Sequence, residues 1–142
     1  MTEYETMVVI DAPPEQVWQV LTDGGAYHEW NPEIVGVEGR MGLGERIVAR
    51  VRLGDGALRR VPMRVSRFEV PSRMEWLGGL PLGLFVGRRT FTVTPRAGKS
   101  EFRLHLEMSG LLSPLISRSV GDRQPEVDTF SAALKRRVEE RG

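Results

Sequence analysis

The sequence has no cysteine and only two histidines among its 142 residues. The absence of cysteine excludes disulfide bonds, thiolate catalysis and thiolate metal sites. Common metal sites need several histidine or cysteine ligands, so we predict no metal centre. The glycine-rich stretches fit neither the Walker pattern nor the dinucleotide-binding pattern, and no serine lies in a Gly-x-Ser-x-Gly motif. We therefore expect no cofactor.

Long apolar runs are also missing. No segment approaches the ~20 apolar residues that span a bilayer, and the first residues, MTEYETM, lack the basic and apolar regions of a signal peptide. We expect a cytoplasmic protein without membrane insertion. The composition, 40% hydrophobic and 27% charged with a net charge of +1, is typical of globular proteins. Residues 1–142 are expected to form a single domain.

Lysine and arginine are absent from residues 1–39, which hold eight acidic side chains, whereas residues 40–73 hold nine arginines. One interpretation of the basic segment is a nucleic-acid or phosphate surface. The other is that the arginines lie on the solvent face of strands. They alternate with apolar residues and lack interleaved exposed aromatics, which favours the second interpretation and no nucleic-acid partner.

The N-terminal third predicts a strand followed by a short helix. Thr2–Ile10 forms the strand, which we place at a sheet edge, and Pro14–Thr22 forms the helix. Pro13 occupies the position of the helix cap and offers no capping oxygen, so either Asp11 supplies it or the cap is weak. A second helical turn follows around Tyr27–Trp30.

Alternating patterns predict six further strands. They lie at residues 34–38, 45–53, 58–70, around 74–76, at 86–95 and at 102–108. Gly54-Asp55-Gly56 predicts a tight hairpin, and a slip in the alternation predicts a bulge near Ser66 and Arg67. Leu77–Val86 is apolar, yet its glycines and proline argue against a regular element. It is either a gate over a cavity or a loop packed under a long helix.

The segment beyond Gly110 predicts helices. Pro125 lacks a backbone donor, so we expect a break between a first portion, Ser113–Val120, and a main helix from Pro125 onward. Apolar residues in the main helix recur at spacings of three and four: Val127, Phe130, Leu134 and Val138.

Ten residues near the N-terminus carry a family resemblance. They are Pro14, Glu15, Val17, Trp18, Leu21, Asp23, Tyr27, Trp30, Asn31 and Pro32. Their pattern resembles the signature of the START-like (SRPBCC) superfamily, in particular its polyketide cyclase/dehydrase-like branch. The resemblance implies an α+β helix-grip fold. In that fold a curved seven-stranded antiparallel sheet wraps around a long C-terminal helix, and two small helices separate the first two strands.

This resemblance also implies a function. The fold leaves a cavity between the sheet and the C-terminal helix, which would bind a hydrophobic small molecule such as a lipid, a polyketide or an aromatic compound. The alternative is an enzyme of the polyketide cyclase/dehydratase type. The shortage of convergent acid and base residues favours binding, although the catalytic alternative stays open. The chain is expected to be a monomer or a homodimer.

The candidate ligand-binding residues are mainly large apolar side chains expected on the cavity wall. They are Trp30, Met63, Trp76, Phe85, Arg89, Phe91, Phe130 and Leu134, with Phe85 at the mouth. Plain core packing is the alternative for each aromatic residue. Arg89 shares the inward phase of its strand and needs a partner, either a structural carboxylate such as Glu75 or an acidic ligand group. We place His28 and His105 on the surface and assign no catalytic residue.

Overall fold

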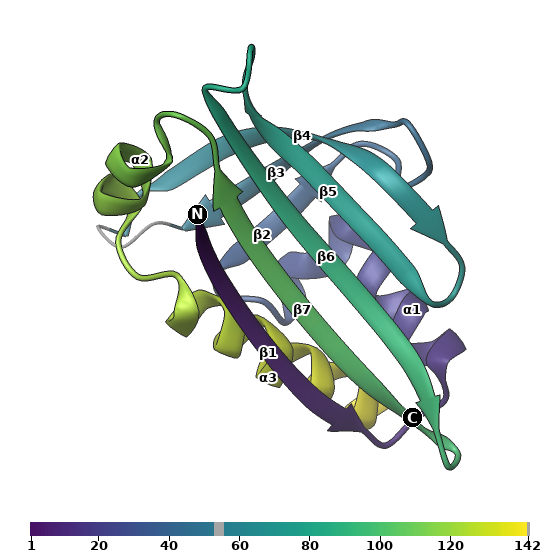
Figure 1. Ribbon diagram of the computed structural model, residues 1–142. Helices are drawn as coiled ribbons and strands as arrows, with labels where there is room; N and C mark the ends of the chain where they lie inside the picture. Colours follow the sequence, from purple (N-terminus) through teal and green to yellow (C-terminus); the bar gives the residue numbers. More distant parts are fainter. Residues whose placement is uncertain (53–55, 142) are drawn as a thin grey trace.

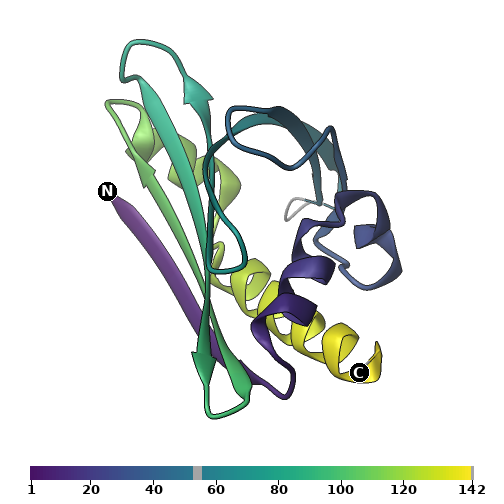
Figure 2. The same cartoon turned by 90° about the vertical axis from the view of Figure 1, so that its right-hand side faces the viewer.

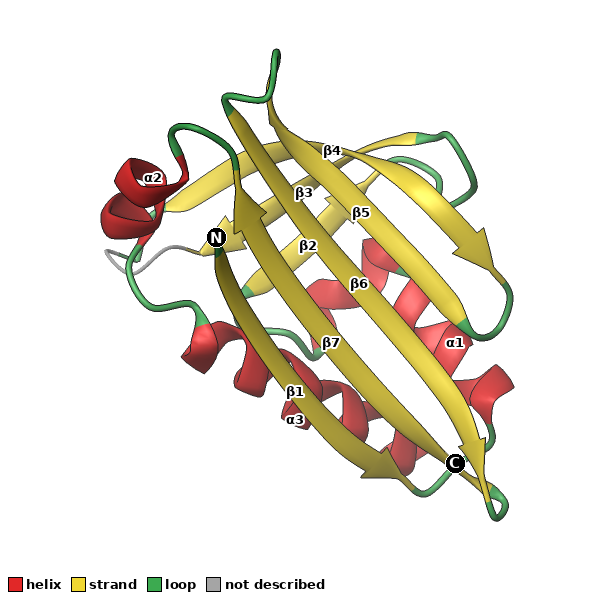
Figure 3. Cartoon of the chain, viewed as in Figure 1, coloured by secondary structure: helices red, strands yellow, loops and turns green. Residues whose placement is uncertain are grey.

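The computed structural model describes residues 1–52 and 56–141. Seven antiparallel strands form one curled sheet in the order β1-β7-β6-β5-β4-β3-β2, with helices on its concave side (Figures 1 and 3). The strands are β1 (Thr2–Ile10), β2 (Ile34–Glu38), β3 (Arg46–Arg52), β4 (Leu58–Glu69), β5 (Arg73–Leu80), β6 (Phe85–Arg96) and β7 (Lys99–Ser109). The helices are α1 (Pro14–Thr22), the 3-10 helix η1 (Gly24–Glu29), α2 (Ser113–Val120) and α3 (Gln124–Arg141). The predicted helix-grip fold is confirmed.

The first strand and the last helix occupy the places that the sequence predicts. Strand β1 lies at an edge of the sheet and pairs with β7 from Thr2 opposite Met108 to Ile10 opposite Ser100. The long helix α3 packs against β1, β7 and α1 on the concave side (Figure 1). None of the helices in the described residues has both the length and the apolar character needed to cross a bilayer.

Inward and outward side chains alternate along the strands as expected. In β3, Ile47, Ala49 and Val51 are buried, whereas Arg46 and Arg50 are exposed. The predicted position of the basic residues on the solvent face is therefore confirmed for this strand. The hairpin predicted from Gly54 and Asp55 lies outside the described residues.

Helix α1 begins without a side-chain cap. Pro13 occupies the cap position, and no side chain bonds to the free N–H groups there. The Asp11 backbone N–H instead donates to Glu139 of α3. The weak cap is thus the correct alternative, and packing holds the helix in place. Trp18 supports that packing through a ring contact of 5.4 Å with Phe68.

The predicted bulge is confirmed, because the pairing of β4 with β5 shifts register between Val65 and Arg67. The prediction that Leu77–Val86 contains no regular element is wrong. Strands β5 and β6 continue to Leu80 and Phe85, which pair across a short turn. Leu82 in that turn is 94% exposed, so the turn is not packed under the helix.

Close backbone approach explains the glycines in this hairpin. A Cβ atom at Gly78 would lie 2.9 Å from the carbonyl oxygen of Pro62 on the neighbouring strand β4. At Gly79, φ is +137°, a conformation that L side chains rarely adopt. Glycine within a strand often marks such an approach or bend. Its presence therefore does not exclude a strand here.

Phe130 of α3 lies at the centre of the aromatic core. Its ring centroid lies 6.0 Å from that of Tyr27, 5.6 Å from Trp30, 5.6 Å from Phe91 and 6.2 Å from Phe102. These residues come from the segment after α1, from β6 and from β7. One side chain of the long helix therefore joins the segment after α1 to strands β6 and β7.

Replacing Phe130 with alanine should lower the free energy of unfolding by about 3–5 kcal/mol, because the substitution leaves a cavity in the aromatic core. Urea unfolding followed by circular dichroism measures the loss. Leu82→Ala is the control and should change stability by less than about 0.5 kcal/mol. Equal losses in the two variants would contradict this description of the core.

Tyr27 is fully buried, and its hydroxyl donates to the Leu21 carbonyl oxygen over 2.5 Å. Burial raises the pKa of the Tyr27 phenol far above its ordinary value; nearby Arg89 partly opposes this shift and Asp23 adds to it. The folded protein therefore keeps this phenol neutral where an unfolded chain would ionise it.

Stability should consequently fall as the pH rises through about 10, the ordinary tyrosine pKa, by up to about 1.4 kcal/mol per pH unit. The urea midpoint of the protein between pH 8 and pH 11 tests this. The Tyr27→Phe variant should lose that part of the pH dependence, whereas Tyr4→Phe at the partly buried edge strand should keep it. Parallel curves for the protein and Tyr27→Phe would refute the assignment.

Candidate functional site

A cavity of about 200 Å3 lies between the concave face of the sheet and the start of α3. Most of its wall is apolar. Four strands contribute to this wall through side chains that face inward: Val51, Val61, Met63, Phe85, Leu106 and Met108. Val120 of α2 closes one end. The position between sheet and helix is the one that the sequence predicts.

Glycines in two adjacent strands line this volume. Trp76 of β5 lies opposite Arg89 of β6, and two residues further along each strand Gly78 lies opposite Gly87. Both pairs face the interior, because side chains two residues apart share a face. A Cβ atom added at Gly87 would meet no atom closer than 3.6 Å. A Cβ atom at Gly87 would therefore fit in ordinary contact with the Phe85 ring.

One end of the cavity is charged. Arg89 is 7% exposed and Glu126 is 2% exposed, and the guanidinium bonds both carboxylate oxygens. Arg89 Nη1 donates to Glu126 Oε2 over 3.3 Å, while Nη2 donates to Oε1. Arg123, in the connection before α3, also donates to Oε1 over 3.4 Å. All three side chains line the cavity.

Arg89 points inward and pairs with a structural carboxylate, as predicted, but that carboxylate is Glu126 and not Glu75. Strand alternation places Glu75 on the opposite face from Trp76, where its carboxylate accepts from Ser66 over 2.8 Å and lies 3.5 Å from Arg88. Glu126 takes its place from the first turn of α3. The pairing therefore joins sheet to helix rather than strand to strand.

Arg89 also marks a boundary within the interior. Phe91 and Val93, which follow it on β6, are completely or almost completely buried, whereas Phe85 and Gly87, which precede it, line the cavity. The other strands follow the same division. Phe102 and Leu104 of β7 are packed in the core, whereas Leu106 and Met108 line the cavity.

Three of the predicted site residues, Met63, Phe85 and Arg89, lie together on the cavity wall. The other five lie on the packed side of the interior: Trp30, Trp76, Phe91, Phe130 and Leu134. Trp30 is partly buried and contacts Phe130, whereas the remaining four are fully buried. Ligand contact by these five residues stays a prediction.

Sequence reasoning missed the charged residues Glu126 and Arg123. A signal for Glu126 was present, because it precedes Phe130 and Leu134 by four and eight residues and so shares their helix face. No comparable periodicity marks Arg123, which lies before the helix begins. Its burial depends on how the connection between α2 and α3 folds back over the sheet.

Neither histidine lies at the cavity. His28 is exposed and bonds only locally, to the carbonyl oxygen of Gly25 over 3.1 Å. His105 Nε2 lies 3.0 Å from a Glu3 carboxylate oxygen on the outer face of the sheet. Glu3, His105 and Glu107 bring their ligand atoms within 4.8 Å of one another. Glu107 also contacts Arg88, so these groups form a surface ion-pair cluster.

A wider groove of about 950 Å3 lies next to the cavity at the gap between β4 and β5. The ladder between these strands ends at Arg64 opposite Leu77, within the described residues, and β4 then curls away with β3 (Figure 2). Four residues line both the groove and the cavity: Met63, Gly78, Gly79 and Phe85. They form the partition between the two spaces.

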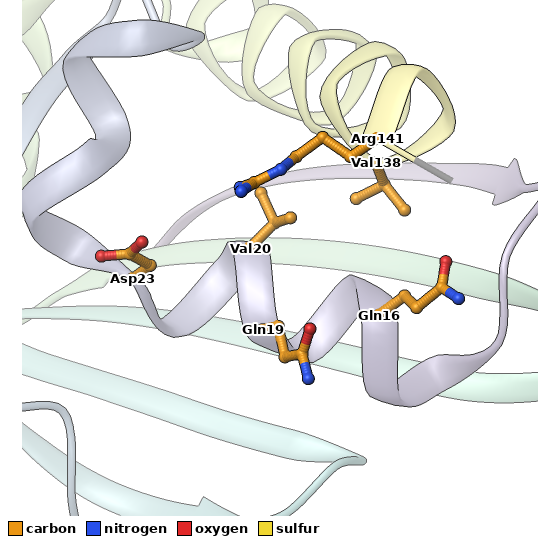
Figure 4. A pocket seen from close by; sticks show the side chains of 6 residues that line it. All are labelled: Gln16, Gln19, Val20, Asp23, Val138 and Arg141. Atoms are coloured by element: carbon orange, nitrogen blue, oxygen red, sulfur yellow. The ribbon is translucent and has the colours of Figure 1, made fainter.

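Another hollow of about 420 Å3 lies between α1 and α3 (Figure 4). Val20 and Val138 are its apolar residues, and its other lining residues are polar or charged: Gln16, Gln19, Asp23 and Arg141. Such a lining is poorly suited to a hydrophobic ligand. The cavity beside Arg89 is the better candidate.

Comparison with known protein families settles the family. A sequence model of the family described as "Polyketide cyclase / dehydrase and lipid transport" matches residues 1–140. The chain belongs to this family. No curated protein matches the chain.

Solved structures of this polyketide cyclase/dehydrase and lipid transport fold resemble the chain throughout. A START superfamily protein from Mycobacterium smegmatis has a TM-score of 0.76 at 17% identity and covers 99% of both chains. A protein from Thermus thermophilus has a TM-score of 0.75 at 20% identity, with 99% of both chains covered. The Zhui aromatase/cyclase from a Streptomyces species has a TM-score of 0.74 at 17% identity, covering 99% of this chain and 94% of its own. At these identities the likeness concerns the fold.

Replacing Arg89 with methionine should lower the free energy of unfolding by about 3–5 kcal/mol, because Glu126 would be left buried without its main partner. Thermal or urea unfolding measures this loss. Arg88→Met, one residue away on the outer face, should cost less than about 1 kcal/mol, as for exposed ion pairs. A combined Arg89→Met, Arg123→Met and Glu126→Leu variant, which removes all three charges of the cluster, should be more stable than Arg89→Met alone. If it is less stable, the ion pair does not explain the loss.

Proposed function

We propose that this protein binds a compact hydrophobic small molecule in the cavity beside Arg89. The main support for this proposal is that Arg89 separates the interior into a packed part and a part with free volume. One side is filled with aromatic rings, whereas the other keeps about 200 Å3 free behind an apolar wall. An apolar cavity of about 150 Å3 suffices to bind benzene. Membership of a family that includes lipid transport supports the same function.

The cavity volume limits the size of the ligand. Pockets for drug-sized molecules measure roughly 300–1,000 Å3, which is larger than this cavity. A one-ring or two-ring aromatic compound or a short acyl chain matches the free space. A larger ligand would have to displace the partition residues Met63 and Phe85. The groove between β4 and β5 lies directly outside that partition and offers an access route.

A second candidate is a cyclase or dehydratase acting on such a ligand. The observation that favours it is the set of charged groups at the cavity, Arg89, Arg123 and Glu126, which could polarise a carbonyl group or hold a proton acceptor in place. The family description names both activities. Binding remains the primary proposal because Glu126 is already engaged by two guanidinium groups.

Filling the cavity tests the proposed function. Gly87→Val should place two methyl groups in the cavity beside β6 and weaken binding of naphthalene-2-methanol, a neutral two-ring probe, by at least tenfold. Valine suits a strand, so the fold should persist. Fluorescence titration of the probe measures the affinity.

The matched control is Thr92→Ile, which adds bulk on the outer face of the same strand and should leave the affinity within twofold. Equal affinity for the Gly87→Val variant and the unmodified protein would place the binding site elsewhere. Absence of probe binding to the unmodified protein would remove support for the proposed function.

A further inference from the structure

We propose that the ligand is a hydrophobic carboxylate whose anionic group binds Arg123 and Arg89 at the charged end of the cavity. This inference rests on the proposed function, because it names the chemical class of the molecule bound in the same site. It arises from the charges that the fold buries there. Among the described residues, two guanidinium groups face one carboxylate, which leaves one of these positive charges without a counter-charge.

All three charged side chains are removed from solvent: Arg89 is 7% exposed, Arg123 is 8% exposed and Glu126 is 2% exposed. Burying a charge is costly unless the charge is paired and hydrogen-bonded. Tyr27, which feels the charge of Arg89, stays neutral because burial raises its pKa. Within the described part of the chain, no ion pair joins Arg89 or Arg123 to any carboxylate except that of Glu126.

The acidic residues nearest along the strands cannot balance this charge from the inside. Glu75 and Glu107 lie on the outer face of the sheet, where both contact Arg88 over 3.5 Å and 3.8 Å. Strand alternation separates them from the cavity by the thickness of the sheet. The surplus positive charge is therefore local to the cavity.

Hydrogen bonding leads to the same conclusion. Glu126 already accepts two bonds from Arg89, and among the described residues Arg123 makes a single bond, to Glu126 over 3.4 Å. A guanidinium group carries five N–H donors, so most donors of Arg123 lack a protein acceptor. Carboxylates match the geometry of arginine and bind it through two parallel hydrogen bonds. Arg123 is therefore positioned to receive such a group from the cavity.

The size and the charge of the site favour a monocarboxylate. One negative charge neutralises the surplus, whereas a phosphate monoester carries up to about two negative charges near neutral pH. The remaining wall is apolar, with Met63, Phe85 and Leu106 available to cover a ring or an acyl chain. A carboxyl group at one end of a compact hydrophobic body fits both parts of the cavity.

Isothermal titration calorimetry at pH 7 with two probes of nearly equal shape tests the inference. Naphthalene-2-carboxylate is anionic, and naphthalene-2-carboxamide is neutral. We expect the carboxylate to bind at least tenfold more tightly. Equal affinities, or tighter binding of the amide, would overturn the inference and leave the proposed function intact. If neither probe bound, the proposed function would fail and this inference with it.

Variants separate a direct role of Arg123 from a structural one. Arg123→Gln keeps the Arg89–Glu126 pair and removes the surplus charge, so it should weaken carboxylate binding at least tenfold and change amide binding less than twofold. Arg118→Gln, at an exposed position of α2, removes one charge outside the cavity and should alter neither affinity by more than twofold. Parallel loss of both probes in Arg123→Gln would indicate a structural role and contradict the inference.

A third variant predicts a change of the opposite sign. Glu126→Gln removes the competing carboxylate and should strengthen carboxylate binding severalfold, provided that circular dichroism shows an intact fold. Weaker carboxylate binding by a folded Glu126→Gln variant would contradict the charge argument. Because Arg123→Gln retains the main ion pair, the test does not depend on Glu126→Gln folding.

Discussion

The buried ion pair between Arg89 and Glu126 joins the sheet to the long helix at the boundary between two kinds of interior. A charged pair inside a protein needs close geometry and hydrogen bonds to offset its lost hydration. On one side of the pair lies the aromatic core, with the fully buried Phe91 and Phe130 two residues after Arg89 and four residues after Glu126. On the other side the same charges meet the cavity. The position of one ion pair thus links the stability of the fold to the character of the site.

The cavity itself follows from the shape of the sheet and from missing side chains. A strongly curled sheet cannot close fully on one helix, and within the described residues the ladder between β4 and β5 ends at Arg64 and Leu77. Gly87 then omits a side chain that would otherwise extend into the space, whereas Gly78 allows Pro62 and Met63 of β4 to approach closely. Because protein interiors are close-packed, such an omission leaves volume that nearby groups do not recover. The unfilled space and the charged end together favour an amphipathic ligand.

Much of the fold could be predicted from the sequence, because regular alternation and proline positions act locally. Examples are the regular alternation of apolar and polar residues in β7 and the helix break before Pro125. The bulge after Val65 was visible as an interruption of the apolar alternation in β4. The hairpin around Gly79 was missed because its glycines accommodate the close approach of a neighbouring strand. Local propensity does not indicate such a contact. The site was predicted less completely. Arg89 was placed inward from its phase, whereas its partner depends on how a distant helix docks, which no strand pattern encodes.

Methyl NMR spectroscopy of the six methionines tests the central claim most directly, because the protein carries its own controls. Met63 and Met108 line the cavity, whereas Met74 is fully buried on the packed side. On titration with naphthalene-2-methanol, the account predicts large shifts of the Met63 and Met108 methyl signals and little change for Met74. Shifts of Met74 as large as those of Met63, or no response from either cavity methionine despite binding, would contradict the division of the interior at Arg89.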